Sequence, residues 1–311
     1  MEELWAFFSS GEARRCRRVF SRVGLALTAM LLLPAGAQIA LQFLVLDRAP
    51  ALLENTFFLY ALSALTTYGT GFPAAMLILR TLPVEELPER RRLSGRTWLK
   101  LWLLAMGWLY IANLITLSLM DGLAALRGSS IPNPIEAMGE LPVAFNLVYS
   151  CLLAPVCEEV CFRWMLLRRL RPWGEGFALC GSALLFALVH GNPYQMLYAF
   201  AVGLVLGGVL LHTGSLRGCI LLHAGVNFVS AGLLPLAGRL GEAGDLLLAL
   251  LVLVSMIWAL RWTFFRGREG LAAFAARAGW GNGESWGHFW VNPGMTLFVI
   301  ALAWSMWLTV G

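Results

Sequence analysis

Residues 23–46 read VGLALTAMLLLPAGAQIALQFLVL, and no charged side chain occurs between Arg22 and Asp47. A helix of about 20 apolar residues crosses the hydrocarbon core of a bilayer, so this stretch predicts a transmembrane helix. Lipid offers no hydrogen-bond partner to an open backbone, which leaves helices and closed barrels as the structures that can span it. The strand-length alternation of a barrel is absent here.

Apolar stretches of this kind recur along the whole chain. Its 311 residues are 59% hydrophobic and 13% charged, with a mean hydropathy of +0.72, whereas a soluble domain is about a quarter charged. The expected spans are 23–46, 56–80, 97–120, 141–166, 174–191, 194–212, 217–236, 244–264 and 293–310. The count is eight or nine, because the fifth span is short. We therefore predict an all-α fold, a polytopic transmembrane helix bundle in the lipid bilayer.

The net charge of +5 comes mainly from arginines between the apolar stretches. In a soluble protein this balance would suggest nucleic-acid binding. In a membrane protein it indicates topology, because cations collect in cytoplasmic loops. The basic clusters fall on alternate connections, at 14–22, 81–100, 168–171, 217 and 266–268. We expect a cytoplasmic N-terminus and no nucleic-acid partner.

Three ionisable side chains lie together in the predicted fourth span, where each costs roughly 2.5–3.5 kcal/mol at the membrane centre. Glu159 and Arg163 are i and i+4 on a helix and can form an ion pair. Glu158 is rotated by about 100° from Glu159, lacks that partner, and is the glutamate left available. Pro155 is expected to bend this helix. Alternatively, all three charges lie at the interface near Arg168 and stabilise a helix end.

Further polar side chains occur in the spans that follow. His190 lies four residues after Phe186, and Asn227 lies four residues after His223, so each pair shares a helix face. A single intramembrane histidine is often a hydrogen-bonded core residue. Polar groups of this kind on three different spans are explained together by one water-filled pocket, because each of them by itself destabilises its span.

Such a set of side chains can hydrolyse an amide bond. A carboxylate beside a neutral imidazole can polarise a water molecule and accept its proton. An imidazole N–H and an asparagine amide can stabilise the tetrahedral oxyanion. No nucleophilic serine or cysteine is needed, and neither Ser182 nor Ser230 lies in a GxSxG setting.

In these motifs the sequence resembles the CPBP (CAAX protease and bacteriocin-processing, or Abi) family of intramembrane glutamic endopeptidases. That family carries the motifs EExxxR, FxxxH and HxxxN on separate helices. Here they read, in the same order, Glu158-Glu159…Arg163, Phe186…His190 and His223…Asn227. The resemblance covers roughly residues 140–235, and it implies that Glu159 and Arg163 hold the site together.

The resemblance also implies a role for the other motif residues. Glu158 and His190 would activate the water, while His223 and Asn227 would form the oxyanion hole. If the fourth and fifth spans are antiparallel, Glu158 and His190 reach one depth only if the segment 168–180 forms an interfacial turn or the fifth helix tilts. Neither a cofactor nor a metal is expected.

Family members act on prenylated CAAX proteins, bacteriocin leaders or C-terminal sorting tails. The composition, rich in Arg, Ala, Leu and Trp, indicates a GC-rich bacterium. We expect a processing or C-terminal sorting peptidase of the inner membrane, acting on a membrane-anchored protein or peptide. The chain would divide into N-terminal transmembrane helices (1–135), a catalytic helical core (136–236) and C-terminal helices with an interfacial segment (237–311).

Three alternatives remain. The first is a non-catalytic membrane scaffold or immunity protein of the same family, since a fold does not imply turnover. The second is a zinc-dependent peptidase with Glu158, His190 and His223 as ligands, although the sequence contains neither HExxH nor paired CxxC. The third is a transporter, against which there are no paired inverted halves.

Overall fold

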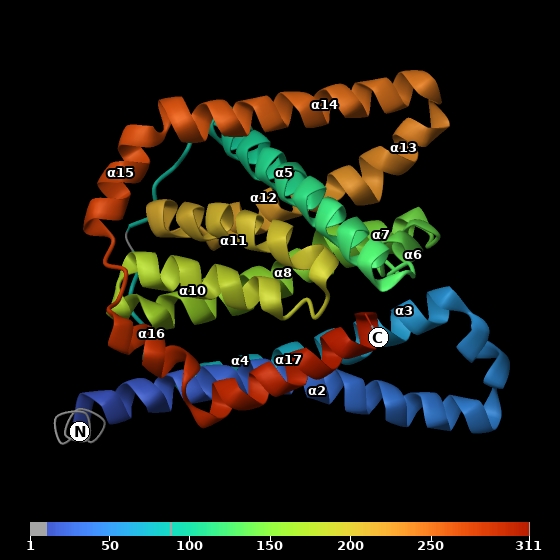
Figure 1. The fold of residues 1–311 in the computed structure, drawn as a ribbon, viewed down its shortest axis with the longest axis horizontal. Coiled ribbons are helices and arrows are strands. Elements are labelled where there is room, and N and C mark those ends of the chain that lie inside the picture. The colour runs from blue at the N-terminus through green and yellow to red at the C-terminus, as the bar shows by residue number, and fades with distance from the viewer. Residues whose placement is uncertain (1–10, 88, 311) are drawn as a thin grey trace.

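The protein is a bundle of helices, seen in a computed structural model that describes residues 11–87 and 89–310. Within these two ranges every regular element is helical and no strand occurs. Most helices run side by side along the long axis of the molecule, and their connections gather at its two ends (Figure 1). The predicted all-α bundle is confirmed.

The N-terminal part contains three long spans. They consist of α2 (Gly11–Arg48), the 3-10 helix η1 (Pro50–Glu54), α3 (Thr56–Thr66), the π-helix η2 (Thr67–Gly71), α4 (Phe72–Leu79) and α5 (Gly95–Arg127). The segments α3, η2 and α4 form one continuous span, Thr56–Leu79.

The central part begins with the short α6 (Glu136–Gly139) and a span that changes its helical form several times. Its segments are α7 (Val143–Val148), η3 (Tyr149–Leu153), α8 (Ala154–Glu158), η4 (Glu159–Leu167), α9 (Arg168–Leu170) and η5 (Arg171–Trp173). It is followed by α10 (Glu175–Leu188), α11 (Pro193–Thr213), α12 (Leu216–Phe228), η6 (Val229–Leu233) and α13 (Leu234–Arg239). The C-terminal part contains α14 (Glu242–Arg261), η7 (Trp262–Arg266), α15 (Arg268–Arg277), α16 (Gly283–Trp290) and α17 (Pro293–Val310).

By length and composition, seven helices in the described ranges can cross a membrane. An eighth span results if the bent pair Gly283–Trp290 and Pro293–Leu308 is counted as one. The lower predicted count, eight spans, therefore agrees with the structure when this bent pair is counted as one span. The predicted fifth span, 174–191, contains α10, which has only 14 residues. A helix of that length measures about 21 Å, short of the hydrocarbon thickness.

Helices approach closely where glycine leaves room for a neighbouring backbone. A Cβ atom added to Gly24 of α2 would lie 2.2 Å from the carbonyl carbon of Gly294 in α17. A Cβ on Gly203 of α11 would lie 3.1 Å from the Cβ of Ala183 in α10. Small residues allow such contacts between membrane helices, which gain van der Waals packing from them. Gly203 and Gly207 form a GxxxG pattern, and both pack α11 against α10.

The basic connections gather at one end of the bundle. The connection 81–94 makes backbone hydrogen bonds to the end of the fourth span and to the end of α11, through Glu85 N to Arg168 O at 3.4 Å and Arg91 N to Thr213 O at 3.0 Å. The start of α2 and the α15 segment lie at the same end (Figure 1). This arrangement is what alternation of the basic clusters predicts.

Candidate active site

Glu158 lies on the fourth span and His190 lies two residues past the end of α10, and a turn at Gly174 joins these two antiparallel helices. Each of the two residues is sixteen positions from Gly174 in the sequence, so the turn brings them to a similar depth. Gly174 has φ +117, and a Cβ there would lie 2.3 Å from the carbonyl oxygen of Gly279. Only glycine fits both the backbone conformation and the contact. The fourth span continues helically to Trp173, so the interfacial turn falls at the centre of the predicted segment 168–180.

The helix that carries the glutamates widens into a π-helical turn, Tyr149–Leu153, just before Pro155. In this turn the N–H of Ala154 bonds to the carbonyl oxygen of Tyr149, five residues earlier. The next donor in the same register would be residue 155, which is proline and has no N–H. The carbonyl oxygen of Ser150 is therefore left without its π-helical partner. Pro155 was expected to bend the helix. Its clearest local effect is that the carbonyl oxygen of Ser150 can accept a hydrogen bond from another helix.

Asn227 of α12 supplies the hydrogen-bond donor for that carbonyl oxygen. Its Nδ2 donates a 2.7 Å hydrogen bond to the carbonyl oxygen of Ser150. A side-chain amide carries two N–H donors, so one remains for another acceptor. The broken helix thereby fixes the position of Asn227 on the helix that carries the glutamates.

Glu159 is the buried centre of the polar cluster. Its carboxylate lies 3.2 Å from Nε of Arg163 and 2.9 Å from Nδ1 of His223. The side chains of Glu159 and Arg163 are 0% and 1% exposed. A buried arginine is tolerated when an opposite charge compensates it. The predicted i, i+4 ion pair is therefore confirmed, and the protein encloses both of its side chains.

Glu158 has a different environment from its neighbour. Its side chain is 16% exposed, and its Oε2 lies 3.8 Å from Nε2 of His223. That distance is longer than a direct hydrogen bond. His223 thus lies between two carboxylates, with Nδ1 on the buried Glu159 and Nε2 towards the accessible Glu158. The adjacent glutamates are separated into a structural and an available one, as the helical rotation between them predicts.

His190 has a defined tautomer. Its Nδ1 lies 2.8 Å from the carbonyl oxygen of Phe186. A carbonyl only accepts, so Nδ1 carries the proton, and in the neutral ring Nε2 is an acceptor. The ring is near enough to Glu158 and His223 to interact with both electrostatically. It can therefore accept a proton or a hydrogen bond at Nε2.

Phe186, one helical turn before His190, contacts three of the polar side chains of the cluster. Its ring meets the rings of His190 and His223 edge to face, with centroids 5.0 and 6.0 Å away. The guanidinium carbon of Arg163 lies 4.1 Å from the centre of the same ring. A cation over an aromatic face is attracted by the ring quadrupole. Phe186 therefore packs three of the polar side chains around one ring.

Three tyrosines that the motif analysis did not single out interact electrostatically with Glu158, namely Tyr68, Tyr149 and Tyr198. Tyr68 and Tyr149 pack against each other edge to face, with ring centroids 5.8 Å apart. Tyr68 lies in the π-helical turn Thr67–Gly71 of the second span, and such turns are frequent at functional sites. The polar run TYGTG in an apolar span was the available sequence signal.

The structure thus links five of the six predicted side chains, and it places the sixth, Asn227, against the backbone of the helix that carries the glutamates. Four of them form a continuous chain of contacts from Glu158 through His223 and Glu159 to Arg163. His190 is bonded to the backbone carbonyl of Phe186, and Asn227 is bonded to that of Ser150 on the helix of the two glutamates. In the described part of the chain, no group of three or more His, Cys, Asp or Glu side chains has an arrangement that could hold a metal ion.

Part of the chain matches the model of a known family. The family model described as type II CAAX prenyl endopeptidase Rce1-like matches residues 140–229. This range contains all three motifs and the broken helix. No curated protein and no solved structure matches the chain.

Proposed function

The chain carries the helical core of the CAAX protease family, of the Rce1-like type, over residues 140–229, and from this premise we propose that it is a glutamic-type intramembrane endopeptidase. It cleaves a peptide bond in a membrane-anchored protein or peptide. This proposal rests on the different environments of the two neighbouring glutamates. Glu159 is 0% exposed and bound to Arg163, whereas Glu158 is 16% exposed and without an ion pair to an arginine or lysine among the described residues.

In the proposed first step Glu158 and His190 bind a water molecule between them. The carboxylate of Glu158 accepts one water proton as the oxygen attacks the carbonyl carbon of the substrate, and the carbonyl π bond opens to an oxyanion. The proton then passes from Glu158 to the amide nitrogen as the C–N bond breaks. His190, with Nδ1 bonded to a carbonyl, orients the water through Nε2.

The oxyanion is stabilised from the α12 side. Asn227 offers its second N–H, since the first is bonded to Ser150. His223 donates through Nε2 when its ring is protonated, because Nδ1 already points to the carboxylate of Glu159. The positive ring would then lie between Glu158 and Glu159, whose charges compensate it. Preorganised donors of this kind each contribute about 10²–10³-fold to turnover.

For the setting, we propose a bacterial inner membrane with the basic end of the bundle in the cytoplasm. Cations in cytoplasmic loops determine orientation, and the basic connections of this chain gather at one end. The N-terminus then lies in the cytoplasm. The substrate is a protein or peptide that undergoes processing or C-terminal sorting at the membrane.

The test compares purified wild type with Glu158→Gln, each with and without a zinc chelator, on a panel of membrane-anchored peptides. We expect cleavage that survives chelation and falls by about 10²–10⁴-fold in Glu158→Gln. Glu269→Gln serves as a matched control, because Glu269 is an exposed glutamate on α15 outside the cluster. Loss on chelation with recovery by zinc would establish a metallopeptidase instead. A wild type inactive on every peptide, including the known substrate classes of the family, would favour the scaffold.

A further inference from the structure

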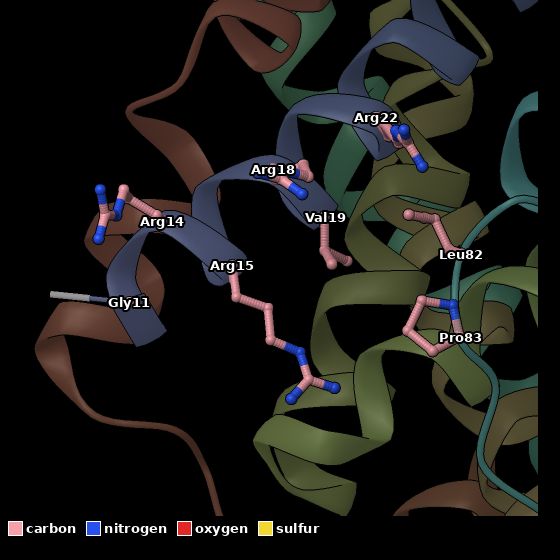
Figure 2. Close-up of a pocket in the computed structure, with 8 residues that line it drawn as sticks. All are labelled: Gly11, Arg14, Arg15, Arg18, Val19, Arg22, Leu82 and Pro83. Carbon is pink, nitrogen blue, oxygen red and sulfur yellow. The ribbon is translucent and has the colours of Figure 1, made fainter.

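A cavity at the basic end of the bundle lies outside the catalytic cluster. Its volume is about 370 Å³, and it is lined by Gly11, Arg14, Arg15, Arg18, Val19, Arg22, Leu82 and Pro83. Figure 2 shows the arginines on successive turns of α2 and the two residues of the 81–94 connection across from them. None of the motif residues contributes to it.

The cavity concentrates uncompensated positive charge. Four of its eight lining residues are arginines, and among the described residues none that lines it is acidic. Arg22 donates a 3.3 Å hydrogen bond to the hydroxyl of Thr81. Because a hydroxyl is neutral, this bond does not compensate the positive charge of Arg22. Arg14, Arg15 and Arg18 are exposed. The guanidinium groups of Arg15, Arg18 and Arg22 repel one another, so an anion placed near them is favoured.

The depth of the cavity in the membrane indicates the source of the anion that it binds. The uncharged stretch that crosses the hydrocarbon core begins after Arg22, and α2 as a whole has 38 residues. A helix of that length measures about 57 Å, whereas the core is about 30 Å thick. The turns of α2 that line the cavity therefore lie beside the apolar stretch, at the level of the lipid headgroups.

The walls of the cavity are amphipathic. Guanidinium groups bind phosphate oxygens through paired N–H donors. Val19, Leu82 and Pro83 form the apolar side of the same cavity. A free phosphate ion uses only the arginines, whereas a phospholipid also places its glycerol and first methylenes on apolar side chains.

We propose that this cavity binds the headgroup of an anionic phospholipid. The lipid phosphate lies among Arg15, Arg18 and Arg22, and the glycerol lies against Leu82. Bound there, the lipid joins α2 to the 81–94 connection, which is itself hydrogen-bonded to Arg168 and Thr213 at the ends of two helices of the central core.

The test uses the full chain in a neutral detergent, where membrane topology has no influence on the result. Binding of short-chain phosphatidylglycerol, phosphatidylcholine and inorganic phosphate is measured by titration for wild type and for Arg15→Gln/Arg18→Gln. The charge-matched control is Arg90→Gln/Arg92→Gln, which removes two exposed arginines from the same end of the bundle, outside the cavity. We expect saturable binding of phosphatidylglycerol, weakened about 10- to 30-fold in the cavity variant and unchanged in the control.

Three results would overturn the proposal. Equal weakening in both double variants would mean that net charge alone attracts the lipid. Equally tight binding of phosphatidylcholine would remove the requirement for an anionic lipid, and equally tight binding of inorganic phosphate would assign the cavity to a soluble anion. The variant Arg15→Lys/Arg18→Lys keeps the charge and gives a second measurement. Weaker phosphatidylglycerol binding in it supports guanidinium recognition of the phosphate, and unchanged binding contradicts it.

Discussion

The side-chain amide of Asn227 is hydrogen-bonded, at 2.7 Å, to the backbone carbonyl oxygen of Ser150 on the neighbouring broken helix. The acceptor is available because residue 155, which would supply the next π-helical donor, is a proline. A helix irregularity on one span therefore positions a candidate oxyanion donor on another.

Replacement of Pro155 by alanine tests this relationship. The substituted alanine supplies a backbone N–H that competes with Asn227 for the carbonyl oxygen of Ser150. We expect lower turnover, with a loss smaller than the 10²–10³-fold expected for Asn227→Ala, and a melting temperature that is unchanged or higher. Cleavage rates and thermal unfolding measure the two effects separately.

The chain contains a matched control for that substitution. Pro235 follows the π-helical turn Val229–Leu233 in the same way that Pro155 follows Tyr149–Leu153. Pro235→Ala should leave turnover unchanged, because no motif side chain is bonded to the carbonyl of Ser230 in the structure. If Pro235→Ala and Pro155→Ala reduce turnover equally, the effect belongs to helix shape and not to Asn227.

The second prediction concerns the stability of the buried ion pair. Arg163→Met leaves Glu159 buried without its partner at 3.2 Å. We expect the free energy of unfolding to fall by about 3–5 kcal/mol, and Glu159→Gln in the same chain to restore part of it. Chemical denaturation in detergent measures both changes.

Glu175 provides the comparison for this pair. It is 34% exposed and bound to Arg171 with the same i, i+4 spacing. Removing a partner from such an accessible pair costs about 0–1 kcal/mol. A loss at Arg163 no larger than that of Glu175→Gln would show that the Glu159 charge is not isolated from solvent.

The third prediction extends the site beyond its motifs. Tyr68→Phe keeps the ring against Tyr149 and Phe72 and removes a hydroxyl that interacts electrostatically with Glu158. We expect kcat to fall about tenfold, the worth of one hydrogen bond near a charged group, while KM and the melting temperature stay unchanged. Tyr60→Phe is the control on the same span, since its hydroxyl is bonded to Pro134. An unchanged kcat in Tyr68→Phe would exclude the hydroxyl from catalysis.

The fourth prediction concerns the packing that positions Phe186. A side chain at Gly203 meets Ala183 at 3.1 Å and the ring of Phe186 at 3.3 Å, whereas nothing lies within 4 Å of a Cβ at Gly208. Gly203→Val should lower the free energy of unfolding by about 1–3 kcal/mol through overpacking and also reduce turnover. Gly208→Val should change neither. Equal effects at both glycines would indicate helix propensity, not contact with α10.

Much of the fold class follows from the sequence, because lipid imposes strong rules on a chain. An apolar stretch such as residues 23–46 has to be helical in a bilayer whatever surrounds it. The predicted bounds of most spans agree with the structure for this reason. The fifth span was less well predicted, since α10 is short and largely surrounded by protein, and burial by neighbouring helices allows a length that lipid alone would not.

Within one helix, the sequence also determined which charges pair. The spacing of Glu159 and Arg163 fixes them on one face, and the structure places them 3.2 Å apart. The same rotation leaves Glu158 on another face. Helical geometry repeats every 3.6 residues, so contacts of this range can be derived without knowing the neighbours.

Only the tertiary structure decided how the motifs meet. The bond from Asn227 to Ser150, the position of Arg163 over Phe186 and the packing of Tyr68 against Tyr149 all join separate helices. Such contacts depend on the depth, tilt and rotation of each helix. These are determined by the packing of small residues between helices and by turns such as the one at Gly174. The sequence determined which polar groups enter the membrane because lipid penalises each one separately, and the tertiary structure determined their partners because hydrogen bonds act over only about 3 Å.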